Sequence, residues 1–312
     1  GGSDYTAAIL AAAVNASVLE IWTDVSGMMT ADPRLVNNIK HIPQISYQEA
    51  MELSHFGAKV IYPPTIQPVM KKGIPVWIKN TFAPEEPGTV IKNEATATGT
   101  SIQGISSINS IVLLSLEGSG MVGIPGFSKR LFEALANASI NVILITQGSS
   151  EHSICVGVDE YASAKAKEVI DAAFAYEIET NKVDPIIVEK ELSIVAIVGD
   201  NMKNHSGISG KMFSALGRNG VSIRAIAQGS SERNISAVIS TADVKKAINV
   251  LHEEFFETTY KQVNLFIGGL GNVGQKFLDQ LQQQKQFLLE KLRIQIRVAG
   301  IANSKKMYFN ED

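Results

Sequence analysis

The chain has 312 residues, of which 45% are hydrophobic and 19% are charged, and its formal net charge is −3. This composition predicts a globular protein of about two or three domains and, because no basic run stands out, argues against nucleic-acid binding. No segment approaches the roughly 20 apolar residues of a membrane span. The same charge balance favours small-molecule partners. The single cysteine, Cys155, cannot form an internal disulfide, so we expect a reducing, cytoplasmic setting.

Alternating helices and strands in the first hundred residues predict an α/β layer. The expected helices and strands are 4–15, 18–22, 47–56, 65–71, 75–79 and 89–92. Gly1-Gly2-Ser3-Asp4 precedes the first helix and is typical of a loop that approaches phosphate, although a helix start capped by Ser3 or Asp4 explains it equally well. Residues 81–101 are rich in Pro, Gly, Thr and Glu, and we place the edge of the first domain, 1–97, within them.

A duplicated domain follows. The pentapeptide Gln147–Glu151 returns 81 positions later as Gln228–Glu232, and the apolar positions on both sides keep that register without a gap. This period exceeds the roughly 20–50 residues of solenoid repeats, so we expect two copies of a small domain. Each copy reads strand, Gly-containing loop, helix, strand, strand, helix, which is a ferredoxin-like βαββαβ module without its last strand.

The last strand of each copy has to come from elsewhere in the chain. Copy one can use Ile186–Val188, whereas only Glu257–Gln262 separates copy two from the next domain. We therefore expect Ile102–Ser106 to cross over and complete copy two. The predicted domains are copy one at 109–190, inserted into copy two at 98–108 and 191–258, and a last domain at 259–312.

Two glutamines are candidate ligand-binding residues. Gln147 and Gln228 each follow an apolar strand, beside the Gly-containing loops 118–126 and 199–207 that open helices. A side-chain amide supplies two donors and an acceptor, and the N-terminal amides of a helix favour a carboxylate. The pattern predicts amino-acid binding, and duplicated structural turns are the alternative.

The last domain begins like a nucleotide-binding βαβ unit. A strand at Val263–Ile267 leads into Gly269-Leu270-Gly271-Asn272-Val273-Gly274, a helix to about residue 290 and a second strand at 294–300. The glycines would let a pyrophosphate rest on the helix N-terminus, although an ordinary strand-to-helix turn is the alternative. The second strand leads into Asn303-Ser304-Lys305-Lys306 rather than an acidic residue, which favours NADP, unless the lysines only form a solvated turn.

Three further motifs carry a family resemblance: Gly1–Ala8, Trp22–Val25 with Thr30–Arg34, and Phe56–Val60. With the repeats and the Gly-rich tail, the whole chain resembles bifunctional aspartokinase–homoserine dehydrogenases, from the last third of the kinase domain to the start of the dehydrogenase. The resemblance implies MgATP or substrate contacts, listed as Ser3, Asp4, Thr23, Asp24, Met29, Arg34, Lys59 and Val60. The family commonly has Tyr at the position of Met29, and often has His and Arg where this chain has Tyr62 and Pro64.

The duplicated modules resemble paired ACT domains, which in this family sense an end-product amino acid, usually threonine. The matching effector positions are Asn141, Gln147, Ser222 and Gln228. The matching NADP(H) positions are Gly269, Gly271, Asn272, Val273, Gly274, Asn303, Ser304 and Lys305. The implied reactions are phosphorylation of aspartate by MgATP and NADPH-dependent reduction of aspartate semialdehyde to homoserine, with no metal site in this chain.

The expected fold is therefore a partial amino-acid-kinase α/β layer, two α+β ACT modules and the start of a Rossmann unit. We expect a piece of a longer enzyme, with neither active site complete, no tightly bound cofactor and no activity alone. Unpaired sheet edges predict a homo-oligomer, at least a dimer, without nucleic-acid or membrane partners. The alternatives are part of a monofunctional aspartokinase and a self-standing amino-acid-binding module.

Overall fold

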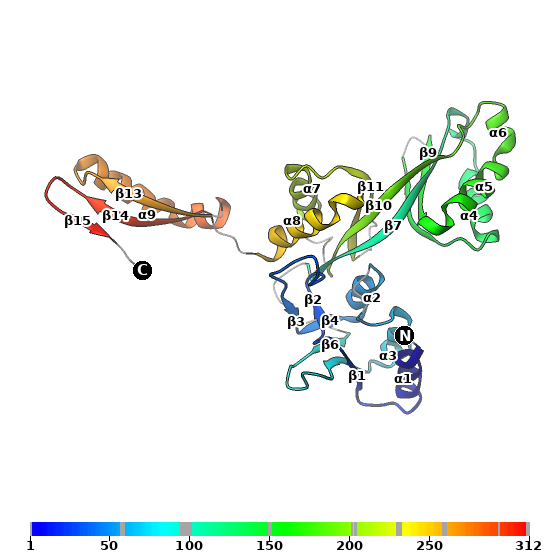
Figure 1. Ribbon diagram of the computed structural model, residues 1–312, viewed down its shortest axis with the longest axis horizontal. Helices are drawn as coiled ribbons and strands as arrows, with labels where there is room; N and C mark the ends of the chain where they lie inside the picture. The colour runs from blue at the N-terminus through cyan, green and yellow to red at the C-terminus, as the bar shows by residue number, and fades with distance from the viewer. Residues whose placement is uncertain are drawn as a thin grey trace. The chain divides into compact units, whose positions relative to one another are not determined.

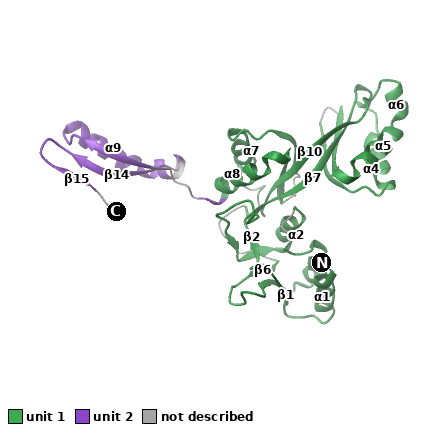
Figure 2. Cartoon of the chain, viewed as in Figure 1, with its two compact units in different colours: residues 1–255 green, residues 256–312 purple. Residues whose placement is uncertain are grey.

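The computed structural model describes residues 2–56, 60–93, 102–148, 152–200, 202, 205–228, 233–257, 261–292 and 294–309. The chain forms two compact units, residues 1–255 and 256–312, which are shown in different colours in Figure 2. No helix in the described parts is long and apolar enough to cross a membrane.

The first unit begins with an α/β layer built on a four-stranded sheet of order β1-β5-β6-β4 (Figure 1). Its strands are β1 (Leu19–Thr23), β4 (Gln44–Ser46), β5 (Val76–Asn80) and β6 (Thr89–Lys92). Its helices are α1 (Gly2–Ala13), α2 (Tyr47–His55), the 3-10 turn η1 (Pro63–Thr65) and α3 (Ile66–Lys72). A two-stranded ribbon joins β2 (Met28–Met29) to β3 (His41–Ile42).

Every helix and strand predicted in this layer is present, with ends shifted by at most two residues. The prediction missed β2, β3 and β4, because strands of two or three residues are too short to show an alternating pattern. The first helix begins at Gly2, so neither Ser3 nor Asp4 is its N-cap and both lie in its first turn.

The rest of the first unit is built on a six-stranded sheet of order β11-β12-β10-β7-β9-β8, which is called the regulatory sheet below because its modules resemble ACT domains. Its strands are β7 (Gly104–Glu117), β8 (Val142–Gln147), β9 (Ser153–Asp159), β10 (Ile187–Val198), β11 (Ile223–Ala227) and β12 (Asn234–Ser240). The helices are α4 (Phe127–Asn137), α5 (Ser163–Ala173), α6 (Ala175–Glu179), α7 (Ile208–Arg218) and α8 (Val244–Phe256). Short 3-10 turns lie at η2 (Ser119–Met121), η3 (Glu160–Ala162) and η5 (Thr241–Asp243). The predicted mixed fold class, with two ferredoxin-like modules, is confirmed.

Two long strands join the modules. In antiparallel register, Gly104 of β7 lies opposite Val198 of β10, and Ser115 lies opposite Ile187. The segment 104–108 therefore completes the copy-two sheet, and 187–189 completes that of copy one. The expectation of separate strands on either side of each junction was wrong, because each pair is fused into one continuous strand.

The junction within each long strand has a left-handed residue. Ser110 has φ +60° and Glu191 has φ +58°, and these residues are 81 positions apart, so they are equivalent in the repeat. The β7–β10 register shifts beside Glu191, between Glu189 and Leu192 and again before Ile194. Such a bulge bends a strand locally, which lets one strand serve two modules.

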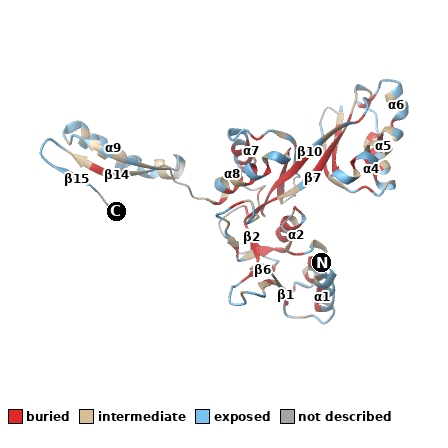
Figure 3. Ribbon diagram, viewed as in Figure 1, coloured by how far each residue is buried: buried red, intermediate tan, exposed pale blue. Residues whose placement is uncertain are grey.

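The strands of the regulatory sheet contribute to two core clusters, one on each face. Figure 3 shows much of β10 coloured as buried. In copy one, α4 and α5 pack on one face, and the Phe127 ring stacks on Phe174 at 5.6 Å between centroids. The other core joins strand residues such as Ile194 and Val198 to Leu53 of α2. The α/β layer described first, called the kinase-type layer below because its motifs resemble a kinase domain, therefore shares its core with the regulatory sheet. Cys155 is half-buried on β9, and burial raises the pKa of its thiol.

The second unit has β13 (Lys261–Gly268), α9 (Asn272–Leu292), β14 (Ile294–Ala302) and β15 (Met307–Phe309). Strands β13 and β14 are parallel, as a βαβ unit requires, and β15 returns antiparallel to β14. The prediction ended the helix two residues early, ended β14 at residue 300 and did not include β15.

Replacing Glu191 by Gly should raise the free energy of unfolding by about 0.5–1 kcal/mol, because an L-residue is disfavoured in the left-handed region and glycine is not. Lys190→Gly is the matched control, since Lys190 is adjacent, exposed and outside that region. It should lower the free energy of unfolding by roughly 0.5–1 kcal/mol. Urea unfolding measures both, and equal destabilisation by the two variants would contradict the assigned strain.

Candidate functional site

A cavity of about 290 Å³ lies at the start of α4 in copy one. Its lining residues come from the Gly-containing loop, the first turn of α4 and the ends of two strands; they are Met121, Gly123, Ile124, Pro125, Gly126, Phe127, Ser128, Gln147 and Ile154. Gln147 is the last residue of β8, so the end of the strand carries its amide into this space. This volume lies just below the roughly 300–1,000 Å³ that is typical of small-molecule sites.

The start of α4 is open to a ligand. Its N-cap is Gly126, with φ +105° and no capping side chain, so no side chain of the cap satisfies the first amides of the helix. These amides and the helix dipole favour a carboxylate at this end. The amide of Gln147 and the hydroxyl of Ser128 add neutral donors and acceptors. Together these groups can bind both polar ends of a free amino acid.

Copy two repeats the glycine N-cap and the glutamine, although His205 and Ser206 replace Ile124 and Pro125 in its loop. Gly207 is again a left-handed N-cap, with φ +89°, at the start of α7. The Gln228 amide oxygen accepts a hydrogen bond from the Ser209 hydroxyl at 3.0 Å, and Ser209 is the repeat equivalent of Ser128. The glutamine of copy two thus lies against the start of its helix. Residues 201, 203–204 and 229–232 of this site lie outside the described residues.

The other two effector candidates lie further from the cavity. Asn141 and Ser222 are exposed residues just ahead of β8 and β11, and Asn141 is not among the residues that line the copy-one cavity. The last three pentapeptide residues of copy one, 149–151, are outside the described residues. In copy one, the structure therefore brings Gln147, but not Asn141, to the loop.

An ion pair fixes α4 in copy one. The Arg130 guanidinium lies 4.5 Å from the Phe174 ring centroid and binds both carboxylate oxygens of Glu177, at 2.5 and 3.0 Å. The hydrogen bonds from Arg130 hold the pKa of the Glu177 carboxyl below its usual value. This pair ties α4 to α6, a helix that the sequence did not predict, and so holds the wall of the cavity.

The kinase-side candidates lie on several elements. Thr23 ends β1, and its hydroxyl donates to the Asp24 carboxylate at 3.1 Å. Met29 is in β2, Val60 follows α2, and Lys59 lies outside the described residues. The Arg34 guanidinium binds the Asp32 carboxylate at 2.6 Å, and these hydrogen bonds lower the pKa of the Asp32 carboxyl. The Arg34 side chain is nevertheless 84% exposed. Its guanidinium can therefore reach a phosphate, which fits an ATP contact.

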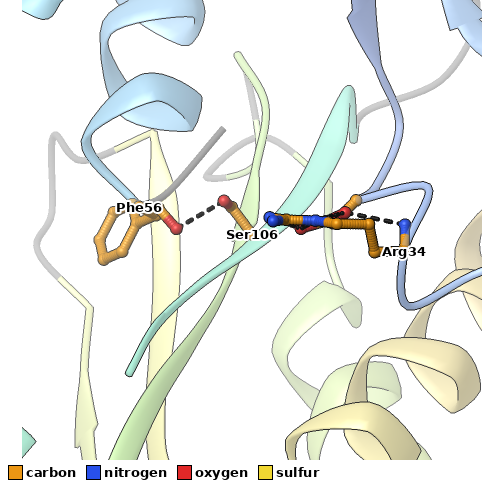
Figure 4. A network of polar contacts seen from close by, with 4 residues as sticks. Arg34, Phe56 and Ser106 are labelled. Atoms are coloured by element: carbon orange, nitrogen blue, oxygen red, sulfur yellow. Dashed lines mark hydrogen bonds and ion pairs between the residues drawn. The ribbon is translucent and has the colours of Figure 1, made fainter. Parts of the chain in front are cut away.

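Contacts between the kinase-type layer and copy two were not predicted. In α2, the buried Glu49 caps its own helix through Ser46 and also accepts a hydrogen bond from the backbone amide of Asp200 at 2.7 Å. At the other end of α2, the Ser106 hydroxyl of β7 donates to the Phe56 carbonyl at 2.6 Å (Figure 4). Two residues of α8 contact the segment 30–35, through hydrogen bonds to Thr30 and Leu35. The α8 contacts could have been suspected from the sequence, because the two repeat copies carry different residues at the contacting positions.

The Gly-rich turn of the second unit needs glycine at two positions. Gly269 has φ +106°, and a Cβ on Gly274 would lie 2.1 Å from the Gly269 carbonyl oxygen, so the helix needs glycine there to approach the turn. α9 begins at Asn272, and Val273 is 85% exposed. At the end of β14, the Asn303 side-chain oxygen accepts hydrogen bonds from the backbone amides of Lys305 and Lys306, at 2.9 and 2.8 Å. That residue therefore holds the turn, and Ser304 and Lys305 are the exposed groups beside it.

Comparison with known proteins gives two family matches. The amino acid kinase family model matches residues 1–80, and the ACT domain model matches residues 114–174 and 195–255. The two ACT segments are offset by the same 81 positions as the repeat.

Relatives match over long stretches. A bifunctional aspartokinase/homoserine dehydrogenase of Haemophilus influenzae is 45% identical over 100% of this chain, which spans 38% of that protein's length. The crystal structure of an allosteric aspartate kinase from Clostridium acetobutylicum is 35% identical, with a TM-score of 0.74 over 82% of this chain and 58% of that one. Escherichia coli aspartokinase III with aspartate and ADP (R-state) is 32% identical, with a TM-score of 0.70 over 82% of this chain and 56% of that one.

The Arg130–Glu177 pair should make stability depend on pH on the acid side. The pKa of Glu177 is lower in the folded protein than in the unfolded chain. The pair therefore adds to the free energy of unfolding above the unfolded pKa, and this stabilisation is lost as the pH falls through the folded pKa. Glu177→Gln should flatten the fall in unfolding free energy between about pH 5 and 3, by less than about 1 kcal/mol since Arg130 is partly exposed. Glu179→Gln, an exposed neighbour on α6, is the control for urea unfolding at each pH. Identical pH curves for wild type and Glu177→Gln would contradict the pair's contribution.

Gly274→Ala should destabilise the second unit by about 1–3 kcal/mol, because its methyl group would overlap the Gly269 carbonyl. Gly271→Ala is the matched control, since a Cβ at Gly271 would meet nothing within 4 Å. Hydrogen exchange of β13 measures both variants. Faster exchange in Gly271→Ala than in Gly274→Ala would show that the turn is not packed as described.

Proposed function

Because the chain belongs to the family of bifunctional aspartokinase/homoserine dehydrogenases, we propose that its ACT modules bind a free amino acid and regulate an aspartate kinase. The observation that carries the proposal is the copy-one cavity, where Gln147 lies beside the uncapped start of α4. The effector carboxylate would bind the helix amides, and Gln147 would accept a hydrogen bond from its ammonium group.

Threonine is the effector that we propose. Among the described residues that line the cavity, none carries a negative charge to pair with the ammonium of a lysine side chain. Burying that charge without a partner would be costly, whereas a hydroxyl can be satisfied by Ser128 or Gln147. The lining also includes Met121, Ile124 and Ile154, which suit the methyl group of threonine. Escherichia coli aspartokinase III with lysine and aspartate (T-state) is one relative whose structure contains a different amino acid.

The catalytic activities of the whole protein follow from the same family. We propose that the kinase segment helps to transfer a phosphoryl group from MgATP to the aspartate side-chain carboxylate, with Arg34 contacting phosphate. We propose that the second unit begins an NADP(H) site for reducing aspartate semialdehyde to homoserine. The Haemophilus relative matches 100% of the chain, whereas the two aspartate kinase structures match 82%. That difference favours the bifunctional enzyme over a monofunctional aspartokinase.

We also propose that the protein is a homo-oligomer, at least a dimer. The outer strands β8 and β11 present Ile145 and Ile226, which are equivalent in the repeat and are 51% and 42% exposed. Apolar side chains on outer strands favour association with another chain.

Threonine should stabilise the chain, by about 2.7 kcal/mol at a hundredfold excess over Kd. Gln147→Ala should weaken binding several-fold, since one neutral hydrogen bond contributes roughly 0.5–1.5 kcal/mol. Titration calorimetry and thermal unfolding measure both effects. Gln67→Ala, an exposed glutamine on α3, is the control, and lysine is the comparison ligand.

Gln228→Ala should weaken threonine binding less than Gln147→Ala, because the Gln228 amide oxygen is already bound by Ser209. Undiminished threonine affinity in both variants would remove the glutamines from the site. Tighter binding of lysine than of threonine would overturn the effector assignment.

A further inference from the structure

Thr30 links the kinase-type layer to the regulatory modules through both its backbone and its side chain. It is 5% exposed and stands just ahead of the segment that carries Arg34. Its backbone carbonyl accepts from the Ile105 amide of β7 at 2.8 Å. Its hydroxyl lies 2.9 Å from Nε2 of His252, which is fully buried in α8. Two different elements of the regulatory part therefore bind this single residue.

The hydroxyl of Thr30 has a second partner. It accepts from the Lys40 amide at 2.9 Å, and the Thr30 amide in turn donates to the Lys40 carbonyl at 2.9 Å. A hydroxyl can donate once and accept twice, so it can bind the imidazole in either tautomer of His252. Because both groups are buried, removing the imidazole would leave the hydroxyl short of one partner.

A second residue of α8 holds the other end of the same segment. The Asn249 amide donates to the Leu35 carbonyl at 2.8 Å. Residues three apart on a helix lie on one face, so Asn249 and His252 contact the segment side by side. Arg34, with its partner Asp32, lies between the two held ends.

The two copies of the repeat differ at both positions. The copy-one equivalents of Asn249 and His252 are Glu168 and Asp171 in α5. Asp171 binds Lys167 and the Ile186 amide, which both belong to copy one. The same helix face therefore serves its own module in copy one and the kinase-type layer in copy two.

We propose that α8 of copy two positions the ATP-binding segment and that His252 is the positioning residue that holds it through Thr30. The inference rests on the proposed function only for the role of Arg34 at ATP. The position of the segment itself is independent of that role.

The experiment compares His252→Leu with His252→Gln, in which an amide of similar reach can donate to or accept from Thr30. Glu254→Gln is the matched control, because Glu254 is on the same helix but binds Arg218 of α7. Hydrogen exchange of residues 28–36 is measured on the chain without ligand. Exchange of β9 serves as the internal check that each variant is folded.

We expect His252→Leu to raise exchange at residues 28–36 at least tenfold, with His252→Gln and Glu254→Gln close to wild type. In the full-length enzyme, His252→Leu should raise the KM for ATP by a factor several-fold larger than the factor by which it lowers kcat. The KM of His252→Gln should be close to that of wild type. Unchanged exchange in His252→Leu, or equal change in His252→Gln, would overturn the proposal. A wild-type protein without aspartate kinase activity would refute the proposed function, while the exchange result would still decide the role of His252.

Discussion

Antiparallel pairing of β7 with β10 is the constraint on which the first unit depends. Each strand contributes one half of its length to each ACT module, so the two modules form one continuous six-stranded sheet. The sheet then presents one face to α2, where Leu53 shares a core with Ile194 and Val198. The kinase-type layer is therefore packed on a surface that both modules build together, and a shift in the register of these strands would disturb all three parts.

Much of this architecture could be predicted because the duplication presents each sequence pattern twice. An 81-residue offset locates equivalent helices, loops and glutamines, and the left-handed glycines Gly126 and Gly207 fall at the same place in each copy. The apolar periods of the longer helices and strands gave their ends to within a few residues. The copy-one cavity was predictable in outline, since Gln147 and the glycine loop had to meet at the end of β8.

The contacts between the kinase-type layer and copy two could not be predicted, because they depend on polar side chains whose partners are far away in sequence. His252 reads as an ordinary histidine of an amphipathic helix, and its partner Thr30 is 222 positions away. Glu49 reads as a capping-box residue, and its second bond to Asp200 leaves no pattern along the chain. Short strands such as β2 and β3 depend on pairing rather than on local preference. Comparison of the two copies, position by position, is the one sequence signal that marks His252.

The shared strands also set the order in which the chain can acquire structure during synthesis. The segment Gly104–Ile108 leaves the ribosome long before its partner Ile194–Val198, whereas the hairpin of β8 and β9 closes over a few residues. Local pairings form early and distant ones late, because closing a long loop has a higher entropic cost. Copy one can therefore complete its sheet with residues 187–189 before the strands of copy two at 192–198, β11 and β12 have been synthesised. Until then, residues 104–108 of β7 form an unpaired strand edge, which exposes this part of the nascent chain to aggregation.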